Sequence, residues 1–279
     1  MFVPPICYKL LVMNFHIITL FPEAFDSYLK ESIVGRAIKE KRIQVTFVNP
    51  RKFVTGKYKR VWPDGNMSQI VDDRPYGGGP GMIIRAEPVL KAVEAVLKKV
   101  KSRKSKVQSK PKIKIINFSP SGQKFDTPYA KQVSKKFTDI ILICGRYEGI
   151  DARVAKILKA QDISIGDYVL TGGELPAMVL IDSISRQIPG VLGKFDSLEE
   201  ERVSSSEFYT RPEILLWHNK YLLDKNGKIV DNSERPKSSL GRRSAEHAKH
   251  GLSKKYKVPP VLLSGDPKKI DEWKTRGEK

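Results

Sequence analysis

Three glycine-containing loops hold the residue types of this chain that are best suited to binding a ligand. They span 117–122 (Asn-Phe-Ser-Pro-Ser-Gly), 144–151 (Cys-Gly-Arg-Tyr-Glu-Gly-Ile-Asp) and 166–176 (Gly-Asp-Tyr-Val-Leu-Thr-Gly-Gly-Glu-Leu-Pro). Each loop follows an apolar run that is typical of a buried strand. Glycine lacks a Cβ, so the backbone of such a loop can approach a ligand closely. Because α/β proteins bind ligands where parallel strands end, we expect these loops to converge on one pocket.

The glycine pattern also narrows the class of ligand. The chain has no G-x-G-x-x-G that opens a helix and no G-x-x-x-x-G-K-[ST], the patterns that cradle phosphates. A further glycine run, 77–81, has no strand directly before it. We therefore expect no nucleoside triphosphate site, and an adenosyl ligand held by backbone amides and carbonyls fits better. The loops alone leave open a second interpretation, three tight turns without a ligand.

Carboxylates and arginines between 144 and 212 are the best candidates for chemistry. The chain has no G-x-S-x-G motif, and its four histidines and two cysteines lack metal-ligand spacing, so we expect neither nucleophilic catalysis nor a metal site. A carboxylate can act as general base, and a guanidinium can stabilise developing negative charge. For any single one of these residues an ordinary surface role is the simpler expectation. The candidates are Glu148, Asp151, Asp167, Glu174, Asp182 and Glu201, with Arg146, Arg153 and Arg186.

The composition indicates a polyanionic partner. The 279 residues carry 51 Lys+Arg against 31 Asp+Glu, a net charge of +20, and the segment 98–114 has nine basic residues and no acid. Nucleic acid is the simplest such partner, and an anionic membrane surface is another. A surplus of charge that serves only solubility is a third interpretation.

Cys7 and Cys144 form no disulfide framework, which suits a reducing compartment. The apolar opening 1–13 is too short to span a bilayer, and translation could start at Met13.

Alternating strands and helices predict an α/β fold with a mainly parallel sheet and crossover helices. The stretch 51–70 is polar and is expected to be a loop, and the basic region after 212 ends in a short helix at 267–273. Strands are expected at 15–20, 44–48, 112–116, 140–143 and within 163–170, and helices at 22–41, 87–100 and 177–186.

Four segments closely resemble the TrmD family of bacterial tRNA (guanine-N1)-methyltransferases, which belongs to the SPOUT class of RNA methyltransferases. They are 71–82 (Val-Asp-Asp-Arg-Pro-Tyr-Gly-Gly-Gly-Pro-Gly-Met), 144–151, 164–178 and 209–212 (Tyr-Thr-Arg-Pro). The likeness covers 15–212 in order and resumes at 258–265 (Val-Pro-Pro-Val-Leu-Leu-Ser-Gly). Multi-residue identities in a fixed order make the resemblance specific.

The resemblance implies a SPOUT-type parallel sheet with a deep trefoil knot, in a cytoplasmic homodimer without a membrane segment. It implies S-adenosylmethionine as methyl donor and tRNA as partner. The methyl group would go to N1 of guanosine 37, immediately 3′ of the anticodon. Magnesium is suggested as an assisting ion, although the sequence contains no dedicated ligand set. The matching cofactor-binding residues are Phe118, Ser119, Pro120, Gly122, Gly145, Tyr147, Glu148, Ile165, Gly166, Asp167, Tyr168, Val169, Leu170, Gly172, Gly173 and Pro176.

The implied catalytic pair is a linker carboxylate and an arginine. N1 of guanine carries a proton at neutral pH, so a general base must remove it while a cation stabilises the charge that develops on O6. The family's base is an aspartate in the interdomain linker, and the matching position here is Glu201, with Glu200 and Glu199 as alternatives. The family's arginine matches Arg186.

The carboxyl-terminal part departs from the family pattern. The family joins its Thr-Arg-Pro segment almost directly to Val-Pro-Pro, whereas a basic stretch, 217–257, intervenes here. The family's helical domain also continues beyond the point that matches Lys279. We therefore expect a remodelled or truncated small domain.

Two other functions stay open: a SPOUT methyltransferase acting on another RNA, and a catalytically silent RNA-binding protein. The predicted division is an extension at 1–14, a SPOUT catalytic domain at 15–190, a flexible linker at 191–212 and a basic tRNA-binding region at 213–279.

Overall fold

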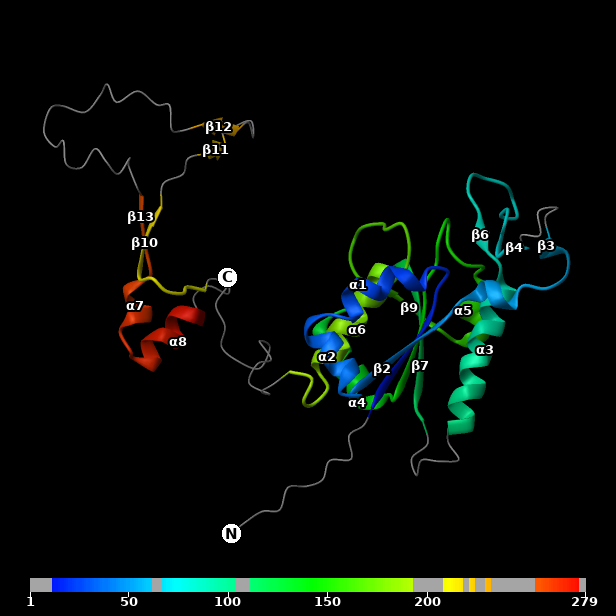
Figure 1. Ribbon diagram of the computed structural model, residues 1–279, viewed down its shortest axis with the longest axis horizontal. Helices are drawn as coiled ribbons and strands as arrows, with labels where there is room; N and C mark the ends of the chain where they lie inside the picture. Colours follow the sequence, from blue (N-terminus) through cyan, green and yellow to red (C-terminus); the bar gives the residue numbers. More distant parts are fainter. Residues whose placement is uncertain are drawn as a thin grey trace, which may run out of the picture. The chain divides into compact units, whose positions relative to one another are not determined.

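The computed structural model describes residues 12–61, 67–103, 111–192, 208–217, 221–223, 229–231 and 254–275 (Figure 1). The chain forms two compact units, residues 1–198 and 199–279, which are described separately below.

A five-stranded parallel sheet forms the centre of the first unit, as the alternation of strands and helices predicted. The strand order is β2-β1-β8-β7-β9, so β8 lies between two strands that precede it in the chain. Both neighbours of β8 pair with it in parallel, as do the other adjacent strands. The strands are β1 (Met13–Ile18), β2 (Ile43–Val48), β7 (Ile113–Lys124), β8 (Asp139–Ile143) and β9 (Gln161–Ser164).

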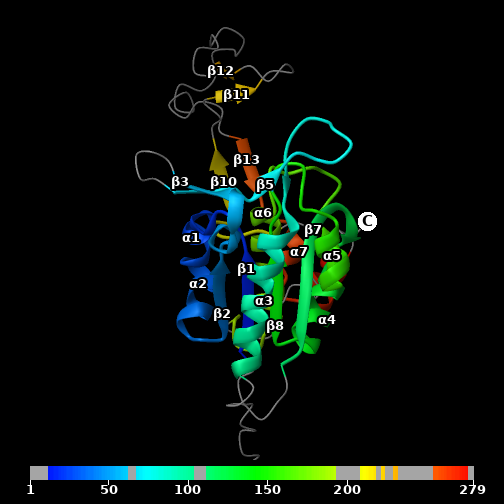
Figure 2. The same ribbon diagram turned by 90° about the vertical axis from the view of Figure 1, so that its right-hand side faces the viewer.

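Helices cover both faces of this sheet, because its central strands are apolar on both sides. Along β8, Ile140 and Leu142 belong to one buried cluster and Ile141 and Ile143 to the other. Figures 1 and 2 show α3 and α5 on one face and α1, α2, α4 and α6 on the other. The first face holds α3 (Ala86–Arg103) and α5 (Arg153–Leu158), with the 3₁₀ helix η2 (Pro50–Phe53); the second holds η1 (Pro22–Phe25), α1 (Asp26–Leu29), α2 (Ser32–Lys39), α4 (Thr127–Lys136) and α6 (Glu174–Arg186).

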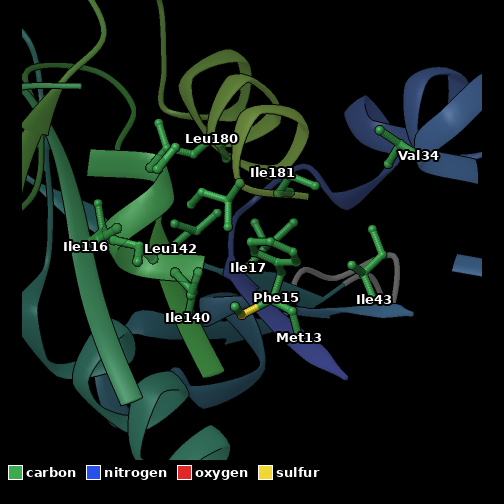
Figure 3. Packing of buried hydrophobic residues seen from close by; sticks show 14 of the residues in the cluster. Met13, Phe15, Ile17, Val34, Ile43, Ile116, Ile140, Leu142, Leu180 and Ile181 are labelled. Atoms are coloured by element: carbon green, nitrogen blue, oxygen red, sulfur yellow. The ribbon is translucent and has the colours of Figure 1, made fainter. Parts of the chain in front are cut away.

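The larger buried cluster lies between the sheet and the second layer of helices. Figure 3 shows Phe15 and Ile17 of β1 and Ile140 and Leu142 of β8 in the same cluster as Leu180 and Ile181 of α6. Phe15, Ile17 and Ile140 are aromatic or β-branched residues suited to strands. Leu180 and Ile181 pack from the inner face of α6. The cluster fixes α6 on the sheet and thereby fixes the loop that precedes it.

Two sequence-based predictions before β7 differ from the structure. The single helix expected at 22–41 is broken, because the backbone turns at Ser32, whose φ is +52°. The polar stretch 51–70 is more structured than the loop expected there. It contains η2, η3 (Gly56–Tyr58) and the hairpin of β3 (Lys59–Val61) with β4 (Met67–Gln69), and the hairpin of β5 (Asp72–Asp73) with β6 (Ile83–Ile84) follows.

The strands at the ligand loops also have different ends from those expected. β7 continues through the predicted loop 117–122, with an irregular register against β9 between Phe118 and Gln123. β9 is shorter than the apolar run that predicted it, because the chain leaves the sheet after Ser164.

The second unit contains two short antiparallel pairs and two helices. β10 (Ile214–Trp217) pairs with β13 (Lys254–Lys257), and β11 (Tyr221–Leu223) pairs with β12 (Ile229–Asp231). The helices are α7 (Pro260–Leu263) and α8 (Pro267–Thr275), the second of which was expected. The rings of Tyr209 and Trp273 lie 6.1 Å apart. The pairing of β10 with β13 brings together the two ends of the basic stretch.

Candidate functional site

A cavity of about 220 Å³ lies where the strands β7, β8 and β9 end, at the carboxyl edge of the sheet. All three predicted loops line it, so the expectation that they converge is confirmed. Its lining residues are Phe118, Ser119, Pro120, Gly145, Arg146, Tyr147, Glu148, Gly149, Ile163, Ser164, Ile165, Gly166, Tyr168, Val169, Leu170, Thr171, Gly172, Gly173 and Pro176.

Two of the predicted cofactor residues do not line the cavity. Gly122 packs against the next strand instead: a Cβ there would lie 2.6 Å from the carbonyl carbon of Asp162. Asp167 points to solvent, with 79% of its side chain exposed, and pairs with Lys124 Nζ at 2.5 Å. Ile163 and Ser164, the last two residues of β9, also line the cavity and were not among the predicted cofactor residues.

Close backbone packing joins the second and third loops. The amide of Gly173 donates to the carbonyl of Gly145 at 2.9 Å, and Arg146 bridges to Gly172 in antiparallel fashion. A Cβ on Gly173 would lie 2.6 Å from Cys144 Cα, a distance that real Cβ atoms essentially never show. The glycine at 173 is therefore required for the two loops to meet.

Tyr147 is held in an unusual backbone conformation at the cavity. Its φ is +60°, the left-handed region that side chains rarely adopt, and 53% of the residue is exposed. Such conformations cost of order 1–3 kcal/mol and persist where the surroundings impose them, often at ligand sites. The aromatic ring is thus presented at the cavity at some cost in stability.

Glu174 lies beneath the cavity in a buried polar network, so the surface role expected for it is wrong. Only 3% of the residue is exposed. Thr19 Oγ1 donates to Glu174 Oε1 at 2.7 Å, and Arg146 Nε lies 2.9 Å from Glu174 Oε2. The Arg146 guanidinium also lies over the ring of Phe21, 4.7 Å from its centroid. As the first residue of α6, Glu174 is favoured by the positive end of the helix dipole.

We expect the Glu174–Arg146 pair to be important for stability. Glu174→Gln should lower the free energy of unfolding by about 1–3 kcal/mol, because it leaves the partly buried guanidinium of Arg146 without its anionic partner. Urea unfolding of the purified variant measures this. The matched control is Asp167→Asn, which breaks an exposed pair with Lys124 and should change stability little. Equal stabilities of the two variants would contradict a structural role for Glu174.

Cys144 is a buried, unreactive thiol rather than a nucleophile. Burial raises its pKa well above the ordinary value, and the negative charge of Glu174 adds to the effect. A thiol in this state is not a thiolate at neutral pH.

Arg186 lies far from the cavity of its own chain. It is the last residue of α6, about 18 Å along the helix axis from Glu174 at 1.5 Å per residue. Just beyond it, the carbonyl of Pro189 accepts from Arg42 Nη1 at 3.4 Å, at the start of β2. The helix therefore runs from the carboxyl edge of the sheet to the amino edge, where the strands begin. Glu199, Glu200 and Glu201 lie outside the described residues.

His16 has a structural role in the sheet. Its Nδ1 lies 2.7 Å from Thr46 Oγ1 and its Nε2 lies 3.0 Å from Asp139 Oδ1. Across the described part of the chain, no three His, Cys, Asp or Glu side chains are grouped as a metal site. The described helices include none that is both long enough and apolar enough to cross a membrane.

Comparisons with known proteins place this geometry in a family. The family model described as tRNA (Guanine-1)-methyltransferase TrmD matches residues 13–215. A tRNA (guanine-N(1)-)-methyltransferase of Clostridioides difficile is 40% identical over 262 residues, which are 94% of this chain and 90% of that protein. Proteins of the same name from Pseudoalteromonas atlantica and Photobacterium profundum are 36% and 40% identical. The first match covers 94% of this chain and 78% of the relative, and the second covers 81% and 85%.

Proposed function

The chain belongs to the TrmD family of tRNA (guanine-1)-methyltransferases, and from this premise we propose that it methylates N1 of guanosine 37 in tRNA with S-adenosylmethionine as donor. The observation that carries the proposal is the cavity at the carboxyl edge of the sheet, which is built by the loops that match the family. Its position is the one at which α/β proteins bind ligands.

The cavity fits an adenosyl ligand in its chemistry. Gly145, Gly172 and Gly173 line the cavity without side chains of their own, so a ligand can approach the backbone closely, and Ile165 and Leu170 supply apolar surface for a base. The site lacks the Lys of a phosphate-binding loop, which agrees with a donor that carries no phosphate. When bound, S-adenosylmethionine supplies an activated methyl group, so the protein has to prepare only the acceptor.

The acceptor needs a base and a cation, and we assign these roles to Glu201 and Arg186. A carboxylate at 201 would take the N1 proton of guanine as general base. The Arg186 guanidinium would stabilise the negative charge that develops on O6, which it can contact with two donors. Glu200 and Glu199 are the alternatives for the base.

We propose that the active site is shared between two subunits of a homodimer. Leu175, Val179, Asp182 and Arg186 recur at intervals of four, three and four residues, so they lie along one side of α6. Leu175 is 55% exposed and Val179 44% exposed, an apolar stripe that a partner could cover. Because Arg186 shares that stripe but is remote from its own cavity, dimerisation through α6 would supply Arg186 to the partner's site.

We also propose that the first unit contains the trefoil knot. β9 lies at one end of the sheet, beyond β7, yet the following helix α6 contacts β1 and η1 in the other half. Between them, the chain packs against the 144–149 loop through Gly173 and Gly145. This return path supports the proposal that the chain is threaded through a loop.

The tRNA substrate and the lack of a disulfide framework support a cytoplasmic location. Assistance by magnesium stays a prediction from the resemblance.

Mapping the modified base tests the function directly. The protein, S-adenosylmethionine and a tRNA transcript with guanosine at position 37 should yield 1-methylguanosine at that position only. A transcript with adenosine at 37 is the matched control and should not be methylated. Methylation of ribosomal RNA in place of tRNA would support the second function, and binding of tRNA without methyl transfer would support the silent RNA-binding protein.

Mixed dimers test the shared site. Arg186→Ala and Glu201→Gln should each be nearly inactive alone, whereas a mixture of the two should regain activity if each residue comes from a different subunit, since some mixed dimers then hold one intact site. Tagging each variant and purifying the doubly tagged dimer provides the measurement. Doubly tagged dimers without activity would place both residues on one chain or make the carboxylate assignment wrong.

The basic stretch between β10 and β13 should strengthen tRNA binding through phosphates. Replacing 218–253 by a short turn should raise the tRNA KM and flatten the dependence of affinity on salt, because each lost phosphate contact reduces the slope of log K against log salt by roughly 0.7–0.9. Cofactor affinity and the methylated position should not change, since phosphate contacts carry no base identity. Filter binding at several salt concentrations measures the slope. An unchanged slope would make the stretch a solvated insert.

A further inference from the structure

The amino edge of the sheet, where the parallel strands begin, carries positive charge that the cavity at the opposite edge does not use. The helices α2, α3 and α4 all end at this edge, and Figures 1 and 2 show α3 descending to it. Exposed lysines gather there, and six of them are here called the amino-edge lysines: Lys39 on α2, Lys99 and Lys101 on α3, Lys112 before β7, and Lys135 and Lys136 on α4.

Acidic residues are nearly absent from this edge. Among the described carboxylates of the first unit, only Glu40 and Asp139 lie at it, and both are already paired with arginines, Arg42 and Arg103. None of the amino-edge lysines forms an ion pair with a described residue. A lysine in the last turn of a helix is favoured by the helix dipole, which accounts for some of the six. It does not account for Lys99 or Lys112, which lie outside the last turns.

A buried network holds this edge in a fixed shape. Asp139 is 1% exposed and accepts hydrogen bonds from Arg103 and Thr138, the latter at 2.8 Å. Arg103 also donates to Asn14 Oδ1 at 2.8 Å, so the end of α3 is fastened to the first residues of β1 and β8. The lysines of α3 are therefore presented from a rigid support.

We propose that the amino-edge lysines bind the phosphate backbone of the tRNA that is being methylated, a contact that rests on the proposed function. Lysine is a point-charge ligand for phosphate, and exposed aromatic rings that could stack on bases are absent from this edge among the described residues. α6 ends at the same edge with Arg186. In the proposed dimer, Arg186 contacts the target base that is bound in the partner's site. Because the amino-edge lysines lie at the same edge as Arg186, the backbone of that tRNA would pass over them.

A triple variant with a charge-matched control tests the contact. Lys99→Gln, Lys101→Gln and Lys135→Gln together should lower the slope of log K against log salt for tRNA by about 2, since each phosphate contact contributes roughly 0.7–0.9. The control replaces Lys30, Lys91 and Lys156 by Gln and removes the same charge elsewhere. Two of its lysines already pair with acids, Lys30 with Asp26 at 3.2 Å and Lys91 with Glu87 at 2.6 Å. S-adenosylmethionine affinity and kcat at saturating tRNA should stay unchanged in both.

The outcomes separate this contact from the function on which it rests. A slope equal to that of the unmodified protein, or an equal decrease in the control, would overturn the proposal. A decrease for a ribosomal RNA fragment but not for tRNA would also overturn it. If the unmodified protein binds tRNA but forms no 1-methylguanosine, the methyltransferase function fails, whereas the slopes still decide the contact.

Discussion

Gly173→Val should abolish binding of S-adenosylmethionine. Already the first added atom would lie 2.6 Å from Cys144 Cα and 3.0 Å from Gly145 N, and both are backbone atoms that cannot rotate away. The 144–149 loop and the 171–173 loop must then separate, which opens the cavity that both of them line. Calorimetric titration of the cofactor measures the loss, and normal affinity would remove the third loop from the site.

Two further variants separate ligand binding from folding. Gly56→Ala is a control for replacing a glycine, because its φ is +63° but an added methyl group meets no atom within 4 Å. It should retain cofactor affinity. Tyr147→Gly removes the ring at the cavity and relieves a positive φ, so affinity should decrease while the melting temperature stays constant or rises. If Tyr147→Gly binds the cofactor normally, the ring has no role in the site.

Glu201→Gln should lose most of the methyl-transfer rate while cofactor and tRNA affinity remain. General-base assistance is worth typically ~10²–10⁴-fold, and an amide of the same size cannot accept the N1 proton. Single-turnover methylation at saturating tRNA measures the rate constant directly. Glu200→Gln and Glu199→Gln are matched controls in the same run of acids. A near-normal rate in Glu201→Gln with an inactive Glu200→Gln would move the base by one position.

The sheet and the pocket loops were predictable because each depends on a local pattern. The strand-like runs at 140–143 and 112–116 are short, rich in isoleucine and followed by glycine loops, which is typical of parallel strands. Parallel strands end at one edge, and the three loops converge there because β8, β7 and β9 are neighbours in the sheet. The strand order itself, with β8 between β1 and β7, depends on packing between distant segments and does not follow from periodicity.

The buried ion pair of Glu174 and the break in the helix expected at 22–41 depend on packing contacts, so hydrophobic periodicity did not predict them. Glu174 resembles any exposed acid at a helix start, and its partners Thr19 and Arg146 lie far away in the sequence. The helical spacing across 22–41 is real, but Gly35 packs against the carbonyl of Lys30, where a Cβ would lie 2.4 Å away. The break between α1 and α2 thus brings the carbonyl of Lys30 against Gly35, a contact that leaves no room for a Cβ.

The pairing of β10 with β13 makes the second unit tolerant of changes in length. The two strands hold Trp217 beside Lys254, so whatever joins them begins and ends at one point. Lengthening such a connection costs little, about 0.6 kcal/mol for each doubling in a flexible loop. Evolution can therefore expand, shorten or exchange this segment without disturbing the helices that follow it. The same position is a natural place to graft a foreign RNA-binding peptide or an affinity tag in an engineered methyltransferase.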